Sequence, residues 1–243
     1  MTADLTEEQL LRLKTRKVVI FTPFYMSQGN SQYFSCLLNT IRVLDRMGIE
    51  CDTLFINGDS YIDRARNTAV SKFLTDFPTY THLVSIDSDM EWDVLGFLRL
   101  ISSPYDFTGA AYPMKNQWDN YCVRHFVNED KTPKMAEEGL IEAELVPGGF
   151  TCISRLALGA MTEEYSSREF ANNSNFHQGN SVALYESVID DGIRYGEDTE
   201  FCRKWLRLKQ KIYCEPRITF SHYGVHSWSG NYHEFLMAQP KAR

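Results

Sequence analysis

Two carboxylates separated by one residue follow an apolar segment of the chain. Asp87 and Asp89 flank Ser88 directly after His82–Ile86, which is typical of a buried strand. In open α/β sheets, ligands bind where the strands end. Two acidic side chains at such a point repel each other unless a positive group neutralises them, and a divalent cation bound to phosphate oxygens is suited to this. The alternative interpretation is a helix N-terminus, where Asp is a favoured capping residue.

A second acidic pair opens a strongly helical segment further along the chain. Gly196 precedes Glu197 and Asp198, and the helical pattern continues to Gln210. The functional interpretation is a general base facing an acceptor hydroxyl. The structural interpretation is that acidic residues in a first turn complement the helix dipole, which is expected to lower the pKa of a carboxylate there.

A basic side chain and an amide lie on a predicted helix upstream of the first acidic pair. Arg66 offers a fork of donors suited to phosphate, and Asn67 both donates and accepts, as a contact to a base or a ribose requires. The alternative is a solvated helix face on which Asp63 pairs with one of these two residues.

Paired glycines and a cluster of histidines complete the candidate groups. Gly148 and Gly149 precede an apolar segment, where glycine permits close approach of the backbone to a ligand but also serves an ordinary tight turn. His222 is followed closely by His226 and His233. A histidine beside a carboxylate pair makes a mixed nitrogen and oxygen site that suits an ion such as Mn²⁺, whereas a lone histidine is usually structural.

Alternating strands and helices are predicted to position these motifs. Apolar segments without strict alternation favour strands that are covered on both faces. The predicted order is helix Leu5–Leu13 with Thr6 as N-cap, strand Lys17–Phe21, helix 30–48, strand Cys51–Ile56, helix 60–76, strand His82–Ile86, helix Glu91–Leu100 and strand Phe107–Tyr112. This order predicts an α/β fold whose mixed, mostly parallel central sheet is flanked by helices.

The α/β rhythm breaks after Pro113. Residues 116–144 are polar and charged, which favours a small antiparallel excursion from the sheet. A stretch rich in Ser, Asn and Gly, Tyr165–Ser181, is typical of a loop. The predicted strands of this half are Tyr121–Val127, Leu140–Val146, Phe150–Ser154, Ile212–Cys214 and Ile218–Phe220.

Length and composition limit the class of protein. The chain has 243 residues, of which 43% are apolar and 23% charged, so it can bury a substantial core. This composition excludes a disordered, collagen-like or coiled-coil protein. With 25 basic and 32 acidic residues the formal net charge is −7, which argues against a passive nucleic-acid binder and suits a protein that holds a cation between carboxylates.

Cysteine spacing and hydropathy bear on the compartment. None of the six cysteines forms a CxxC pair, so a zinc ribbon is not expected, and reduced thiols in a cytoplasmic protein are the prediction. No apolar segment is long enough for a membrane span, and no signal peptide is evident. A soluble, cytoplasmic protein without a membrane anchor is therefore expected.

Six motifs occur together in one order from about Val18 to Trp228. They are Ala65-Arg66-Asn67, Asp87-Ser88-Asp89, Ala111-Tyr112-Pro113-Met114-Lys115, Pro147-Gly148-Gly149-Phe150 with Arg155 after it, Gly196-Glu197-Asp198, and Ser221-His222-Tyr223-Gly224. This series resembles the glycosyltransferases of the GT-A fold, and most of all their inverting, GT2-like branch. The resemblance implies one GT-A domain over residues 1–243, with an N-terminal helix (1–16), a nucleotide-sugar-binding half (17–112) and an acceptor and catalytic half (113–243).

The resemblance also implies roles for individual residues and a cofactor. Asp89 and His222 would bind Mn²⁺ or Mg²⁺, and Asp87 would hold a ribose or a metal-bound water. Asp198 would deprotonate the acceptor hydroxyl while Glu197 orients sugar or acceptor. The residues expected to contact the nucleotide, sugar or acceptor are Thr22, Pro23, Tyr25, Arg66, Asn67, Asp87, Ser88, Gly148 and Gly149.

The implied substrates are a nucleotide diphosphate sugar and an acceptor hydroxyl. A UDP-sugar is favoured as donor, and a glycan or glycoconjugate as acceptor. A modified DNA base is a minor branch: the excursion carries Lys115, Arg124, His125, Lys131 and Lys134, but the net charge of −7 disfavours nucleic acid.

Two other classes of protein remain open. One is a noncatalytic module that binds nucleotide sugars or glycans, and it would tolerate loss of Asp198. The other is a sugar nucleotidyltransferase, which usually has a glycine-rich phosphate loop after its first strand. Residues 22–30 contain a single glycine, Gly29, which counts against that class.

Overall fold

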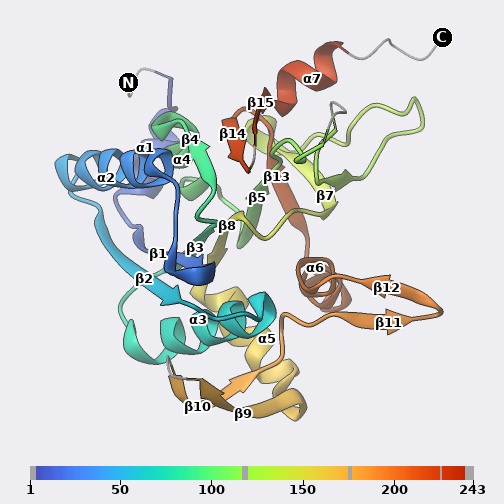
Figure 1. Cartoon of the computed structure of the whole chain (residues 1–243). Coiled ribbons are helices and arrows are strands. Elements are labelled where there is room, and N and C mark those ends of the chain that lie inside the picture. The colour runs from blue at the N-terminus through green and yellow to red at the C-terminus, as the bar shows by residue number, and fades with distance from the viewer. Residues whose placement is uncertain (1–3, 117–119, 175–176, 225, 239–243) are drawn as a thin grey trace.

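The computed structural model describes residues 4–116, 120–174, 177–224 and 226–238. An eight-stranded sheet forms its centre (Figure 1). Within the described residues, six of the eight strands run in one direction, and only β8 and β7 are reversed. The strand order is β2 (Glu50–Asn57), β1 (Lys17–Phe24), β3 (His82–Ile86), β8 (Phe150–Ser154), β5 (Phe107–Ala110), β13 (Ile212–Glu215), β7 (Ile141–Leu145) and β6 (Arg124–His125).

Helices cover both faces of this sheet. The described helices are α1 (Glu7–Leu13), α2 (Ser31–Arg46), α3 (Ile62–Asp76), α4 (Val94–Ile101), α5 (Arg155–Glu164), α6 (Glu197–Arg207) and α7 (Tyr232–Ala238). Buried side chains of α1, α2 and α4 pack in one core cluster, and those of α3, α5 and α6 pack in a second. Successive residues of β1 alternate between the two: Val18 and Ile20 join the first, Val19 and Phe21 the second.

This arrangement explains the uninterrupted apolar strands of the sequence. A strand covered on both faces needs apolar side chains at every position, and all five residues of β3 are buried. The predicted α/β class, with a mostly parallel central sheet flanked by helices and small antiparallel parts, is confirmed. The predicted strands Tyr121–Val127 and Leu140–Val146 are shorter than expected, and as β6 and β7 they extend one edge of the main sheet.

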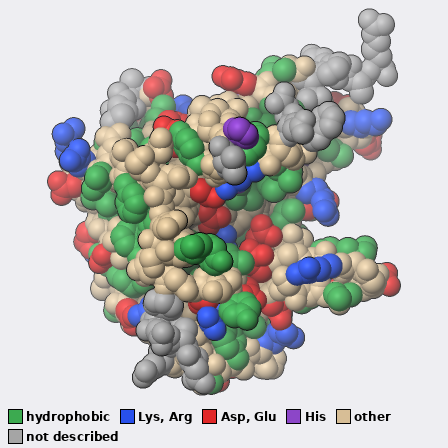
Figure 2. Space-filling model, viewed as in Figure 1, with side chains coloured by type: hydrophobic (Ala, Val, Ile, Leu, Met, Phe, Trp, Pro, Cys, Tyr) green, Lys and Arg blue, Asp and Glu red, His purple; other side chains and the backbone are tan. Residues whose placement is uncertain are grey.

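Smaller antiparallel sheets surround the central one. Strand β14 (Thr219–Tyr223) pairs with β15 (Ser227–Asn231) on one side and with β4 (Met90–Trp92) on the other. A hairpin of β11 (Val188–Asp190) and β12 (Ile193–Tyr195) projects from the body just before α6 (Figure 1), and the space-filling view shows it as a separate lobe (Figure 2).

Two sequence predictions of local structure were wrong. The helix predicted from Glu91 begins only after Asp93, whose side chain caps it. Glu91 and Trp92 belong instead to the strand β4 (Met90–Trp92), whose Met90 and Trp92 side chains are buried beside β14. The stretch Tyr165–Ser181 is not simply a loop, because it contains most of the antiparallel hairpin β9 (Glu169–Ser174) and β10 (His177–Val182). No helix among the described residues is long and apolar enough to span a membrane.

Candidate active site

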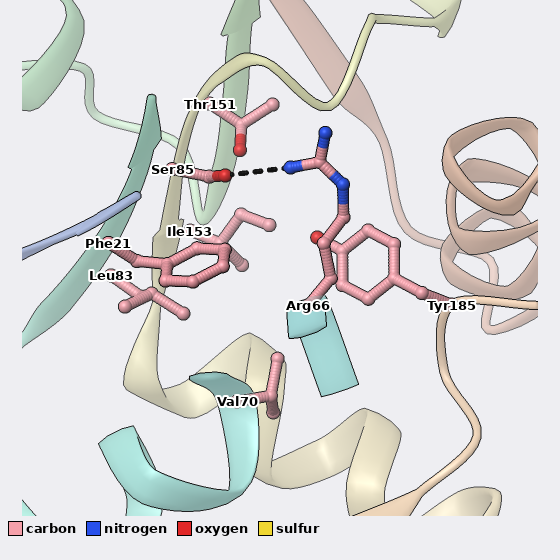
Figure 3. A pocket seen from close by; sticks show the side chains of 8 residues that line it. All are labelled: Phe21, Arg66, Val70, Leu83, Ser85, Thr151, Ile153 and Tyr185. Carbon is pink, nitrogen blue, oxygen red and sulfur yellow. Dashed lines mark hydrogen bonds between the residues drawn. The ribbon is translucent and has the colours of Figure 1, made fainter. Parts of the chain in front are cut away.

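Arg66 on α3 joins segments that lie far apart in the sequence. Its Nη1 donates to the Ser85 hydroxyl and to the Gly148 carbonyl, each at 3.0 Å. Its Nη2 lies 3.1 and 3.3 Å from the two carboxylate oxygens of Asp87. Its Nε is 3.7 Å from Oε1 of Glu197. Figure 3 shows this side chain reaching from α3 toward Ser85 on β3. One guanidinium therefore connects both acidic motifs with the paired-glycine turn.

Burial and neighbouring charges act on the Arg66 pKa in opposite directions. The side chain is only 5% exposed, and burial alone lowers its pKa. The charges of Asp87 and Glu197 outweigh burial, so the pKa is raised above its ordinary value. Arg66 is thus a buried cation that stays charged. It neutralises Asp87, which follows the end of β3, and Glu197, which begins α6.

The paired glycines are required by close packing. A Cβ on Gly148 would lie 3.1 Å from the guanidinium carbon of Arg66. A Cβ on Gly149 would lie 2.5 Å from Oδ2 of Asp87 and 2.5 Å from the Tyr112 hydroxyl. The absence of side chains therefore lets this turn press directly against the Arg66–Asp87 pair.

The carboxylates at the start of α6 have different environments. Asp198 accepts hydrogen bonds from the backbone N–H groups of Gly148, at 3.4 Å, and Thr199, at 2.7 Å. Glu197 is partly buried, and burial together with the charge of Asp198 raises its pKa, although Arg66 opposes this. The expected lowering of a carboxylate pKa by the helix dipole is therefore wrong for Glu197, because desolvation and a like charge outweigh the dipole.

Asp89 and His222 face each other across the β4–β14 pair. The His222 Nε2 lies 3.7 Å from Oδ1 of Asp89, and that oxygen is buried without a hydrogen-bond partner. The other oxygen of Asp89 forms an ion pair with Lys115. Burial alone would raise the Asp89 pKa, but His222 and Lys115 outweigh it and lower the pKa.

The chemistry of this pair fits a divalent cation. His222 Nδ1 lies 2.9 Å from the Pro113 carbonyl, which accepts its proton, so Nε2 is the nitrogen that carries the lone pair when the ring is neutral, the form that binds a metal. Metal-bound histidines commonly donate their second nitrogen to a carbonyl in this way. A lone pair and an unpartnered carboxylate oxygen then face each other, an arrangement that a cation between them satisfies. Among the described residues no group of three or more His, Cys, Asp or Glu side chains is arranged so that it could hold a metal ion, and Asp87 turns to Arg66.

The remaining predicted site residues have varied surroundings. Thr22 is fully buried and shares a hydrogen bond with the Tyr33 hydroxyl. Tyr25, on the short 3-10 turn after β1, is 64% exposed, while Pro23 and Ser88 are half-buried. Asn67 is buried, and its amide bonds the backbone of residues 184 and 185. In the structure its polar atoms therefore fix the chain between β10 and β11.

Several neighbours of the site were not assigned from the sequence. Lys115 was noted as part of a motif and as one of the basic residues of the excursion, yet it forms an ion pair with Asp89. Ser85 supports Arg66 from β3, and the Tyr185 ring lies 5.9 Å from the guanidinium. No local signal marks Ser85 or Tyr185, because both act on Arg66. In the sequence Arg66 lies 19 residues from Ser85 and 119 residues from Tyr185.

Comparisons with known proteins add little to this geometry. No family model and no curated protein matches the sequence. One similar solved structure is described as a glycosyltransferase involved in the glycosylation of the major capsid of PBCV-1. Its identity to this chain is 9% and its TM-score 0.35, over 65% of this chain and 68% of the other. Similarity of this degree carries no argument about activity.

Proposed function

We propose that this protein is a metal-dependent glycosyltransferase of the GT-A type. It transfers a sugar from a nucleotide diphosphate sugar to an acceptor hydroxyl with inversion at the anomeric carbon. The observation that carries the proposal is the Asp89–His222 pair. A buried, unpartnered carboxylate oxygen that faces a histidine nitrogen at 3.7 Å is a pair of ligands for a cation, at the end of a strand where nucleotides bind in α/β folds.

Residues on the donor side hold the leaving nucleotide. Asp89 and His222 would hold Mn²⁺ or Mg²⁺. When bound, such an ion neutralises diphosphate oxygens and stabilises the nucleotide as negative charge builds on it. Arg66 holds Asp87 in a fixed orientation, which keeps that carboxylate available for a ribose hydroxyl. Lys115 supplies a further positive charge beside Asp89.

Residues on the acceptor side carry the proton transfer. Asp198 takes the proton of the acceptor hydroxyl, whose oxygen forms a bond to the anomeric carbon as the bond to the diphosphate oxygen breaks. Glu197 orients the sugar or acceptor beside it. Gly148 and Gly149, whose turn packs directly against Arg66 and Asp87, border the reacting groups.

The favoured donor is a UDP-sugar and the favoured acceptor a glycan or glycoconjugate. Support for the acceptor class comes from the net charge of −7, which disfavours a polyanionic acceptor such as DNA.

The test is a release assay for nucleotide diphosphate with a panel of nucleotide sugars and Mn²⁺. The wild-type protein is expected to turn over one donor class. Asp89→Ala and Asp198→Ala should each lose turnover while the circular dichroism spectrum stays unchanged. Retained turnover in both variants would overturn the assignment, and nucleotide binding without turnover in the wild type would favour a noncatalytic module.

A further inference from the structure

We propose that a groove between β15, α7 and the segment after β5 is the acceptor subsite, and that it takes a carbohydrate with a sugar ring against Trp228. This inference rests on the proposed transferase function and specifies its acceptor. The groove has a volume of about 600 Å³, enough for a small oligosaccharide. Arg66 and the residues that it contacts do not line the groove.

The groove adjoins the Asp89 corner of the candidate site. Its wall includes Pro113, whose carbonyl accepts from His222, and it lies close to Lys115, the ion partner of Asp89. A Cβ on Gly224 would lie 3.2 Å from the Trp228 ring and 3.4 Å from the Lys115 side chain. His222 and Trp228 are also opposite each other in the β14–β15 ladder, so their side chains share one face of that sheet. A molecule in the groove therefore lies next to the proposed cation pair.

The lining of the groove combines aromatic rings with hydrogen-bonding groups. Tyr121 and Phe235 pack with ring centroids 5.1 Å apart, and Trp228 lines the same groove from β15. Ser229 and Asn231 are polar residues that also line the groove. Sugars present apolar C–H faces edged by hydroxyls, so rings that cover one face and polar groups that meet the edge are the complementary chemistry.

Charge favours a carbohydrate over a nucleic acid as the occupant. Among the described residues that line the groove, Glu234 is the single charged side chain. A carboxylate accepts hydrogen bonds from sugar hydroxyls and repels phosphate, whereas nucleic-acid sites neutralise phosphates with Lys and Arg. The acidic balance of the whole chain acts in the same direction.

The experiment is ligand-observed NMR on the full chain with methyl glycosides of glucose, galactose and mannose. The wild type is expected to bind at least one of them. Trp228→Ala should weaken that binding at least tenfold, whereas Trp228→Phe should retain part of it because a ring remains. Leu156→Ala, which changes an 80% exposed apolar residue that does not line the groove, is the matched control and should bind as the wild type does. Circular dichroism verifies that each variant is folded.

Donor turnover to water separates this inference from the proposed function. Trp228→Ala should still release nucleotide diphosphate from the donor in the absence of acceptor. The acceptor subsite is overturned if the wild type binds none of the glycosides, if Trp228→Ala binds them unchanged, or if a DNA oligonucleotide binds instead and depends on Trp228. Absence of donor turnover in the wild type would reject the transferase function, while Trp228-dependent glycoside binding would still identify a carbohydrate site.

Discussion

Arg66 and Asp87 form an ion pair at the end of the central strand β3, with Nη2 3.1 Å from Oδ1. The arginine is 5% exposed and the carboxylate 28% exposed, so the pair is largely withdrawn from water. The same guanidinium lies 3.7 Å from Glu197 and bonds the Gly148 carbonyl. A single buried cation thus fixes the relative position of both acidic motifs.

Removal of this cation should destabilise the fold strongly. In Arg66→Met, the carboxylates of Asp87 and Glu197 lose their shared partner, and loss of one member of a buried pair costs about 3–5 kcal/mol. Urea denaturation measures the free energy of unfolding. Lys72→Met, on the same helix, is the control: it removes an exposed pair with Asp76 and should cost about 0.5 kcal/mol. A loss below about 1 kcal/mol in Arg66→Met would contradict the structural role.

Substitution of Gly149 should be far more damaging than that of another glycine. Gly149→Ala places a methyl group 2.5 Å from Asp87 and from the Tyr112 hydroxyl, so the Arg66–Asp87 pair must shift. We expect a clear fall in melting temperature together with weaker nucleotide binding. Gly159→Ala on α5 meets nothing within 4 Å and should be neutral or stabilising by about 0.5–1 kcal/mol. Equal effects of the two substitutions on melting temperature would argue against close packing at Gly149.

His82 should make the fold sensitive to acid. Burial, aided by the charge of Arg16, lowers its pKa to about 3 from an ordinary 6.5. Between these values the unfolded chain binds a proton that the folded chain does not, so the free energy of unfolding falls as pH decreases through that window. At pH 5 this loss is about 2 kcal/mol relative to pH 7.5.

His82→Gln removes the titrating group and isolates its contribution. The difference in unfolding free energy between wild type and variant should shift by about that amount between pH 7.5 and 5, in the direction that disfavours the wild type at pH 5. Urea titrations at the two pH values measure it. A difference that does not change with pH would show that His82 is not held neutral by the fold.

Asp198 should matter for turnover and not for stability. If Asp198 is the general base, Asp198→Asn lowers kcat by about 10²–10⁴-fold and leaves donor KM nearly unchanged. Glu197→Gln should reduce kcat less, because its proposed role is orientation. Asp190→Asn, on the projecting hairpin and 55% exposed, is the control carboxylate. If Asp198→Asn retains wild-type kcat, another group must take the proton.

The sequence predicted the frame of the site better than its connections. Asp87 and Asp89 at the end of β3, and Glu197 and Asp198 at the start of α6, follow from local apolar and helical patterns. The contact of Arg66 with the Gly148 carbonyl spans 82 residues and has no local signature. Individual ion pairs of that kind arise only when the sheet assembles.

Local patterns were also misleading where tertiary pairing decides structure. Glu91 and Trp92 were assigned to a helix over Glu91–Leu100, yet they belong to a strand that pairs with β14 about 130 residues later. The pKa of Glu197 shows the same dependence. Helix position alone predicts a lowered pKa, but burial and Asp198 raise it.

The most direct measurement is calorimetric titration of the protein with UDP, GDP, CDP and dTDP, each with and without Mn²⁺. We predict that UDP binds and that its affinity falls at least tenfold without the ion. Asp89→Asn should lose this dependence on Mn²⁺ while remaining folded. Failure of a well-folded wild-type protein to bind any of the four nucleotides in the presence of Mn²⁺ would contradict a metal-dependent glycosyltransferase.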